Sequence, residues 1–363
     1  MSQFRPELRP VAPSALPLTD PERAWSFVLQ HAPELPGWPR LPRRSFLESP
    51  AIQLCEGFPG VIFERDHIYI DEVWQRDTLL DKLYIAYLAD DFTYGEISPE
   101  YAACLGLLAS NIQNVHPTNG SLWSAIAPGN KLPAPLAVKG QILGPLSWGA
   151  EVCERQGRPI LYNEELMDIV AKHLRLKAGW QERVLRQVAP ASLMILEEPL
   201  LTVSSVDTLP FDRDRCESLM CDVLNGLTGL RGVACTYPVA DIVLNLPADV
   251  LSVDVSSLPE PDPQGLQVVW TFVERGGFVI WAIVPAGGES AEAVPGIAEL
   301  TARLLDWLAA AAPDEEQRAR LAAASMVTAG GNLAGVEEQQ AAQVLALTAQ
   351  LSHAARTACG FEK

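Results

Sequence analysis

The chain has 363 residues, of which 48% are hydrophobic and 20% are charged, and its formal net charge is −18. This is the composition of an ordered globular protein with enough chain for one large core or two ordinary domains. So acidic a chain, without a long basic run, is a poor candidate for nucleic-acid binding. No apolar run approaches the roughly 18 residues of a membrane-spanning helix. The Met1–Asp20 segment lacks the apolar core of a secretory signal. We therefore expect a cytoplasmic protein without a nucleic-acid or membrane partner.

The N-terminal third is predicted to contain short elements separated by prolines. Residues 1–19 are proline-rich and are expected to form a loose arm, after which Asp20-Pro21 opens a helix that reaches about His31. The Trp38–Phe46 segment contains Pro39 and Pro42, so it is expected to be extended rather than helical. The periodicity predicts further helices at residues 48–56, 72–90 and 98–112, and a hairpin at residues 60–71.

From Pro135 onward, strands and helices alternate. The predicted strands cover residues 135–143, 192–196, 232–236, 250–256, 278–284 and 323–328. The helices between and after them are predicted at residues 146–156, 163–188, 212–227, 263–275, 294–312 and 337–357. The Trp38 segment is counted as a seventh strand, and an eighth is expected within Trp123–Pro145.

This alternation favours a closed barrel over an open sheet. No Gly-x-Gly-x-x-Gly motif follows an early strand, which argues against a dinucleotide-binding domain. The expected fold is α/β, a single (β/α)8 TIM barrel over residues 35–363. An N-terminal extension, the arm and helix of residues 1–34, precedes it.

The functional site is expected within the stretch Arg231–Ser257. Two β-branched runs enclose a compact helical piece, Asp241–Leu246, and leave no room for a hairpin partner. Strand, short helix and strand form a parallel unit, in which functional groups lie where the strands end. The residues at these ends are Cys235, Tyr237 and Asp254. The seven cysteines form no Cys-x-x-Cys pair, so reduced thiols are expected, and a buried strand-end thiol without a function is the simplest interpretation of Cys235. Asp254 could equally bind a ligand or cap the next loop.

Other polar residues stand near predicted strand ends. Glu197 and Glu198 follow a buried strand, where two acids need partners, although an acidic loop that caps the next helix is the alternative. Arg40, with Arg43 and Arg44, suits an anion, or pairs with surface acids. His116 stands in a loop of turn formers, where a structural role is the commoner one. Trp148 and Tyr237 would suit a flat ligand, but core packing is the more frequent use of Trp148.

Several short pieces, in order, resemble the barrel domain of cobalamin-independent methionine synthase. The wider superfamily also contains uroporphyrinogen decarboxylase and corrinoid-dependent methyltransferases, and the likeness is to short, single-barrel forms. The matching pieces are Leu35–Pro42 with Glu48 and Gln53, Gly140–Pro145, Ile195–Pro199, Val250–Asp254, Trp281–Pro285 and Ser325–Thr328. The resemblance implies methyl transfer to a thiol such as homocysteine. It implies that Glu197 holds the acceptor's amine, that Cys235 and Asp254 line the reacting end, and that a methylated corrinoid protein is the donor.

The chain departs from the family at its zinc site. In the family, zinc holds the acceptor as its thiolate, since a free thiol is mostly protonated at neutral pH. Its ligands come from a His-x-Cys strand end, an acid one strand later and a cysteine after the last strand. Here these places read Cys235-Thr236-Tyr237, Asp254 and Ala329–Asn332, without histidine or a second cysteine. Two ligands do not ordinarily hold zinc. We therefore predict no tightly bound metal or other cofactor.

Two alternatives stay open. A metal-free barrel like uroporphyrinogen decarboxylase would use the arginines at its mouth to hold the acidic side chains of a tetrapyrrole. A barrel without catalytic activity would bind a corrinoid or a partner methyltransferase.

Overall fold

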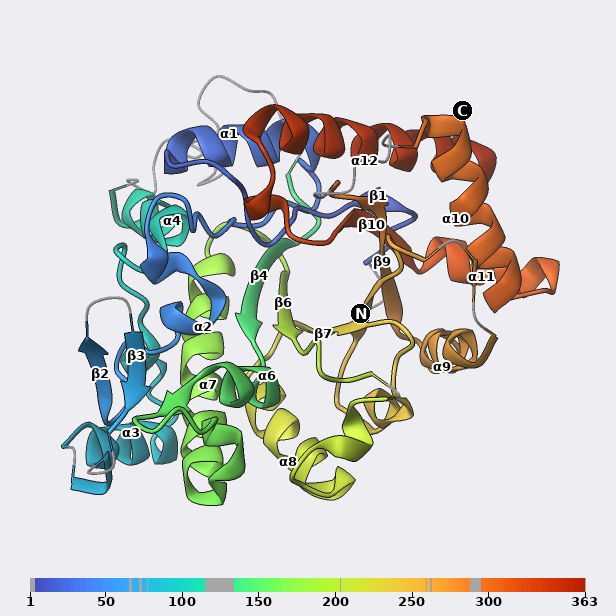
Figure 1. Ribbon diagram of the computed structural model, residues 1–363. Helices are drawn as coiled ribbons and strands as arrows, with labels where there is room; N and C mark the ends of the chain where they lie inside the picture. The colour runs from blue at the N-terminus through green and yellow to red at the C-terminus, as the bar shows by residue number, and fades with distance from the viewer. Residues whose placement is uncertain are drawn as a thin grey trace.

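The computed structural model describes residues 4–64, 67–71, 74–76, 78–114, 134–202, 204–258, 260–261, 263–287 and 295–362. Within these ranges, a seven-stranded parallel sheet curls through the molecule in the order β1-β10-β9-β8-β7-β6-β4 (Figure 1). The strands are β1 (Arg9–Pro10), β4 (Val138–Leu143), β6 (Ser192–Glu197), β7 (Leu230–Thr236), β8 (Val250–Asp254), β9 (Phe278–Pro285) and β10 (Ser325–Gly330).

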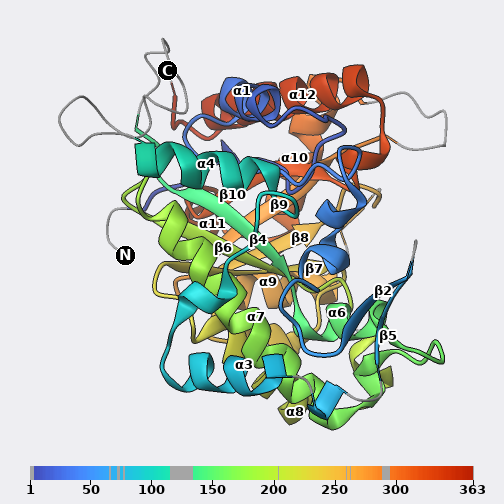
Figure 2. The ribbon, with the colours of Figure 1, turned by 90° about the vertical axis from the view of Figure 1, so that its left-hand side faces the viewer.

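Helices pack around this sheet. Helix α7 contacts β4 and β6, while α10 and α12 lie beside β9 and α12 also beside β10, as Figures 1 and 2 show. The helices are α1 (Pro21–His31), α2 (Pro50–Gln53), α3 (Thr78–Leu88), α4 (Ala103–Asn114), α6 (Pro145–Glu151), α7 (Glu164–Leu185), α8 (Arg213–Leu224), α9 (Pro263–Glu274), α10 (Ile297–Ala311), α11 (Glu315–Ala323) and α12 (Glu338–Ala358). None of the helices in the described ranges is long and apolar enough to cross a membrane.

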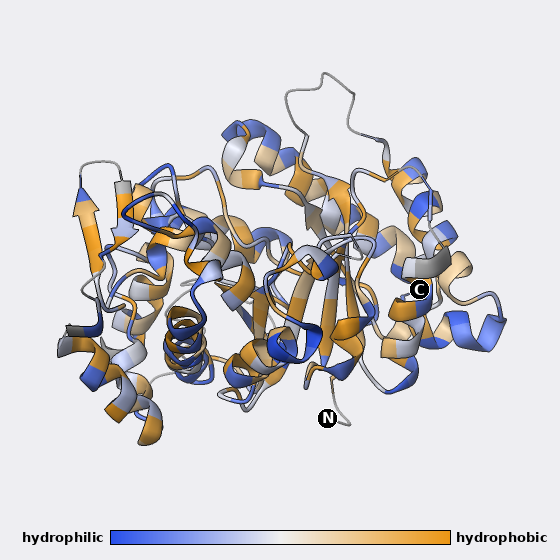
Figure 3. Ribbon diagram, turned by 60° about the horizontal axis from the view of Figure 1, so that its bottom comes forward, coloured by the Kyte–Doolittle hydropathy of each residue, from blue (hydrophilic) through white to orange (hydrophobic). Residues whose placement is uncertain are grey.

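The six strands predicted from Pro135 onward are confirmed. All six residues of β4 are buried, and the strands of the curled sheet are hydrophobic along most of their length (Figure 3). Continuous apolar strands are expected where a parallel sheet is covered by side chains on both faces. The helical piece predicted at Asp241–Leu246 is a short 3-10 helix at Asp241–Asn245, and β7 and β8, which flank it, are paired in parallel.

The predicted closed ring of eight strands is wrong. The proline-rich arm is not loose, because Arg9 and Pro10 pair with Met326 and Val327 of β10. The Trp38 segment makes only isolated bridges, between Ala15 and Arg40 and between Gly37 and Lys139. Prolines 36, 39 and 42 have no backbone N–H group, which explains why this segment forms no continuous ladder of strand hydrogen bonds.

The sheet is therefore open between β1 and β4, although residues 35–40 lie between them. A side chain at Gly37 would place its Cβ 3.0 Å from Lys139 Cβ and carbonyl oxygen, so the glycine permits the close approach to β4. The fold is consistent with a TIM-like barrel of seven strands in the part of the chain that is described. The eighth strand was expected within Trp123–Pro145, of which residues 123–133 lie outside the described ranges, while the remainder contains β4.

A second, three-stranded sheet lies outside the curled one. It contains β2 (Val61–Glu64), β3 (His67–Ile70) and β5 (Cys153–Glu154), in the order β2-β3-β5. Strands β2 and β3 are antiparallel, as the alternating pattern of residues 60–71 predicts. The predicted start of the first helix is also confirmed, because the Asp20 carboxylate accepts hydrogen bonds from the backbone N–H groups of Glu22 and Arg23.

Candidate functional site

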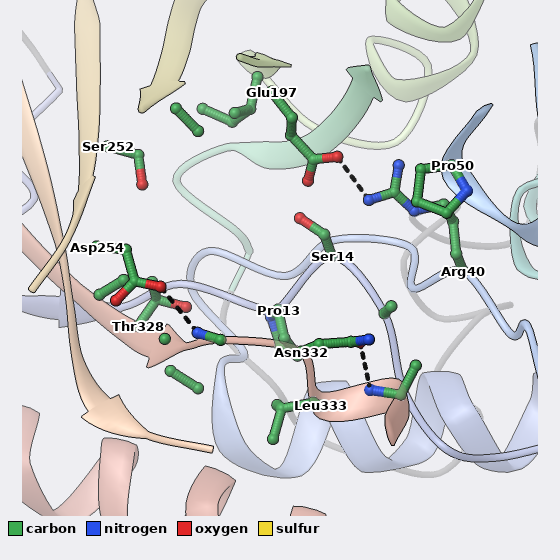
Figure 4. Close-up of a pocket in the computed structure, with 18 of the residues that line it drawn as sticks. Pro13, Ser14, Arg40, Pro50, Glu197, Ser252, Asp254, Thr328, Asn332 and Leu333 are labelled. Atoms are coloured by element: carbon green, nitrogen blue, oxygen red, sulfur yellow. Dashed lines mark hydrogen bonds and ion pairs between the residues drawn. The ribbon is translucent and has the colours of Figure 1, made fainter. Parts of the chain in front are cut away.

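A cavity of about 620 Å3 lies at the carboxyl ends of the parallel strands. Glu197 of β6, Cys235 of β7 and Asp254 of β8 line it together with Arg40. Figure 4 shows Glu197 and Arg40 on one side and Asp254 on the other. The carboxyl ends of neighbouring parallel strands lie on one edge of the sheet, where ligands bind in α/β proteins of this kind. The cavity is therefore the candidate site.

One wall of the cavity carries three charges, of which Arg40 and Lys139 are buried and Glu197 is 18% exposed. The Nη2 atom of Arg40 donates a hydrogen bond to Glu197 Oε2 at 2.6 Å. The Lys139 ammonium donates to the carbonyl oxygen of Ala12 at 3.1 Å and to Ser14 Oγ at 2.9 Å. Lys139 is the second residue of β4, and Ser14 comes from the N-terminal segment that was expected to be loose. This wall thus joins four segments that are far apart in sequence.

Burial and neighbouring charges have opposite effects on the pKa values of Lys139 and Glu197 in this wall. Burial lowers the pKa of Lys139 to about 8, although Glu197 opposes this effect. Burial alone would raise the pKa of Glu197, but Arg40, Lys139 and Ser14 outweigh it and hold the pKa below its ordinary value. Glu197 is therefore ionised at neutral pH, while Lys139 changes its charge within the physiological range.

Asp254, on the opposite side, is held by backbone groups. Its Oδ1 atom accepts hydrogen bonds from Ser256 N at 2.9 Å and Ser256 Oγ at 2.7 Å, and its Oδ2 atom accepts from Gly331 N at 2.9 Å. Both of the roles that the sequence left open are thus compatible with its position, since it lines the cavity and also holds two loops. These bonds fix the carboxylate and connect the end of β8 to the turn after β10.

Cys235 lines the cavity but is only 5% exposed. Burial raises the pKa of its thiol, and the carboxylate of Glu198 raises it further. The thiolate is the form that attacks electrophiles and binds metals. Cys235 is therefore a neutral thiol in the folded protein and is better suited to shaping the cavity than to acting as a nucleophile.

Glu198 lies away from the cavity, among the residues that hold helix α6. Its Oε1 atom accepts from Leu146 N at 2.8 Å, and its Oε2 atom accepts from Ser147 N at 3.0 Å and Ser147 Oγ at 2.6 Å. Burial raises its pKa to about 7 despite these hydrogen bonds. The helix-capping alternative considered from the sequence matches this arrangement, although the helix that it caps is α6 rather than the next one.

Two aromatic candidates also lie outside the residues that line the cavity. The Tyr237 ring packs edge-on against Trp307, with centroids 5.2 Å apart. Trp148 is fully buried, and its indole N–H donates to the carbonyl oxygen of Ala51 at 2.7 Å. Both residues contribute to the core, as the alternative interpretation of Trp148 predicts. His116 lies outside the described residues.

Of the three clustered arginines, only Arg40 lines the cavity. Arg43 donates to the carbonyl oxygens of Ala334 and Val336, and Arg44 pairs with Glu48. Sequence reasoning missed Lys139 and Ser14. The signal for Lys139 was present, because a lysine within the apolar run of residues 135–143 must be buried beside a partner.

The residues present do not fit the zinc ion of the methionine synthase family. Among the described residues, no three His, Cys, Asp or Glu side chains are grouped so that they could hold a metal. Both Asp254 oxygens already accept hydrogen bonds from N–H groups. A tetrahedral zinc site needs at least three protein ligands, with cysteine deprotonated. The expectation that the protein holds no tightly bound metal stays a prediction.

The fold is that of an α/β protein with a curled, open parallel sheet, consistent with a TIM-like barrel, and the cavity lies at the carboxyl ends of its strands. No protein-family model and no curated protein matches the chain. Among solved structures, the chain is similar to a methyltransferase from Methanosarcina mazei, with a TM-score of 0.53 and 12% sequence identity over 94% of this chain and 86% of that one. It is also similar to a B12-independent methionine synthase from Shewanella sp. W3-18-1, with a TM-score of 0.46 and 12% identity over 67% of this chain and 69% of that one. At this identity, the likeness concerns the fold.

Proposed function

We propose that this protein is a methyltransferase that moves a methyl group to a small thiol such as homocysteine, with a methylated corrinoid, free or on a partner protein, as the donor. The observation that carries the proposal is the single cavity that gathers Glu197, Arg40, Cys235 and Asp254 at the strand ends. The sequence motifs around these residues resemble the methionine synthase family. A methyltransferase also shares the fold over 94% of this chain.

Different residues of the cavity bind different groups of the acceptor. Glu197 is ionised and mostly buried, so it suits an ammonium group of the acceptor, while Arg40 beside it suits an anionic group. Asp254, Cys235 and the glycine-containing turn at Gly330 surround the other end of the acceptor. In the reaction, the sulfur forms a bond to the methyl carbon as the bond from that carbon to the donor breaks, the electron pair of the broken bond stays on the corrinoid, and the thiol proton passes to solvent. The protein contributes the relative position of the two reactants.

The proposal is tested with purified protein, methylcobalamin and homocysteine, and methionine is measured by mass spectrometry. We expect methionine to form at a rate that dialysis against a chelator leaves unchanged. The Glu197→Gln variant should lower kcat/KM for homocysteine by about tenfold or more, because a charged hydrogen bond contributes about 1.5–3 kcal/mol. Glu315→Gln, at an exposed position on α11, is the matched control. Absence of methionine with both free and protein-bound methylcorrinoid would refute the proposal.

A second function deserves a test because Arg40 is buried in the cavity wall. A barrel like uroporphyrinogen decarboxylase would bind an anionic tetrapyrrole through such arginines. Arg43 and Arg44 bond elsewhere, so Arg40 is the one arginine of this cluster that would meet the acidic groups of that ligand, which favours a smaller substrate. Binding of uroporphyrin that disappears in an Arg40→Ala variant would support this second function. Binding of a corrinoid without turnover would support a role without catalysis.

A further inference from the structure

Two cations, Arg40 and Lys139, line the cavity beside the Glu197 carboxylate, and the acids Glu48, Glu151 and Asp254 line it as well. Arg40 is 4% exposed and Lys139 is 6% exposed, and both line the cavity. Glu197 is ion-paired with Arg40, Glu48 pairs with Arg44, and Arg40 opposes the rise in the pKa of Glu151 that burial causes. Affinity of this wall for a further anion therefore comes from hydrogen-bond donors without partners, not from an excess of positive charge.

The hydrogen bonds of the two cations leave donors without partners. Within the described residues, Nε and Nη1 of Arg40 are buried and have no hydrogen-bond acceptor, whereas Nη2 donates to Glu197. Lys139 uses two of its three N–H groups on Ala12 and Ser14. Guanidinium groups are well suited to carboxylates because their N–H donors match carboxylate oxygens in geometry and charge. A small anion that enters the cavity would therefore meet donors from two residues.

We propose that Arg40 and Lys139 form a binding site for a carboxylate group of the substrate. The site selects small carboxylic acids, and Ser14 holds the lysine in place. The carboxylate site does not depend on the proposed function. Only the identity of the other groups of the substrate depends on it. If that function is right, the acceptor is an amino acid whose carboxylate binds Arg40 and Lys139 while its ammonium group faces Glu197.

Three ligands distinguish the contact with the carboxylate group from the contact with the ammonium group. Methionine carries both charges, methylthiobutyrate has the same chain with the carboxylate alone, and methylthiopropylamine has the ammonium group alone. Their affinities for the full-length protein can be measured by isothermal titration calorimetry. We expect methylthiobutyrate to bind saturably through the carboxylate contact, and methylthiopropylamine to keep only the contact with Glu197. No saturable binding of methylthiobutyrate would overturn the inference.

Substitutions test which residues bind the carboxylate of the ligand. Lys139→Met and the double variant Arg40→Met, Glu197→Gln, which leaves no unpaired acid, should each weaken methylthiobutyrate binding by about ten- to a hundredfold. Glu197→Gln alone should keep methylthiobutyrate binding and weaken methionine binding. Arg213→Met is the control, because Arg213 is about half exposed and pairs with Asp207 and Asp241. Affinities of the Lys139 and Arg40 variants within twofold of the unmodified protein would overturn the inference.

A measurement on the unmodified protein covers the case in which these variants do not fold. Affinity for methylthiobutyrate should fall as the pH rises through about 8, where Lys139 loses its proton. The charged groups that face Lys139 are Arg40 and Glu197, and the pKa of Glu197 is held below its ordinary value, so Glu197 does not titrate in this interval. An affinity that does not change from about pH 7 to about pH 9 would contradict the role of Lys139. Carboxylate binding without methyl transfer would retain this inference and remove the proposed function, and methyl transfer without carboxylate selectivity would do the reverse.

Discussion

Glu198 provides a strong test of the structure, because its buried carboxylate should make stability depend on pH. The Glu198→Gln substitution keeps the size of the side chain and removes its titration. Both Glu198 oxygens accept hydrogen bonds from residues 146 and 147, yet burial raises the pKa from its ordinary value of 4.5 to about 7. Ionising this group in the folded protein therefore costs about 3 kcal/mol more than ionising it in the unfolded chain.

The sign follows from proton binding. Between pH 4.5 and about 7, the folded protein binds a proton at Glu198 and the unfolded chain has released it. The stability that the protonated group contributes is therefore complete below pH 4.5 and is lost as the pH rises through about 7. Because glutamine does not titrate, the Glu198→Gln variant should gain about 3 kcal/mol relative to the unmodified protein over this interval.

The free energy of unfolding can be measured by urea titration with tryptophan fluorescence, at about pH 5 and about pH 8. Comparison of the two proteins at each pH removes the contribution of the other carboxylates, which both share. Glu315→Gln, at an exposed position, should leave the difference between the two pH values unchanged. If Glu198→Gln also changes that difference by less than about 1 kcal/mol, Glu198 does not titrate as a buried acid and the reasoning is refuted.

Three further predictions concern packing and reactivity. A Cβ at Gly144 would lie 2.2 Å from Glu198 Oε1, so Gly144→Ala should reduce stability by about 1–3 kcal/mol. Gly296→Ala, whose Cβ would meet no atom of the described residues within 4 Å, should be nearly neutral in the same urea titration. Trp148→Phe should reduce stability by about 1–2 kcal/mol through loss of the indole hydrogen bond, with methionine affinity unchanged in calorimetry, whereas a ligand-binding tryptophan would show the reverse. In native protein, Cys235 should be alkylated by iodoacetamide more slowly than the more exposed Cys153, as measured by peptide mass spectrometry, and equal rates would contradict its burial.

Local patterns in the sequence predicted much of the fold. The six strands from Pro135 onward, the hairpin at residues 60–71 and the Asp20 helix cap follow from side-chain periodicity and capping, which act over a few residues. The common location of Glu197, Cys235 and Asp254 could also be predicted, since parallel strands place their carboxyl ends on one edge of a sheet.

Contacts between distant segments were decided by the tertiary structure. The pairing of Arg9 with Met326 joins opposite ends of the chain, and no local pattern in the arm indicates it. The direction of each acid at the end of β6 was equally open, because successive side chains point to opposite sides and either of the two could face the cavity. Glu197 faces Arg40 in the cavity, while Glu198 caps helix α6. Periodicity determines which residues form strands, but only the packing of the whole chain determines which charged groups meet.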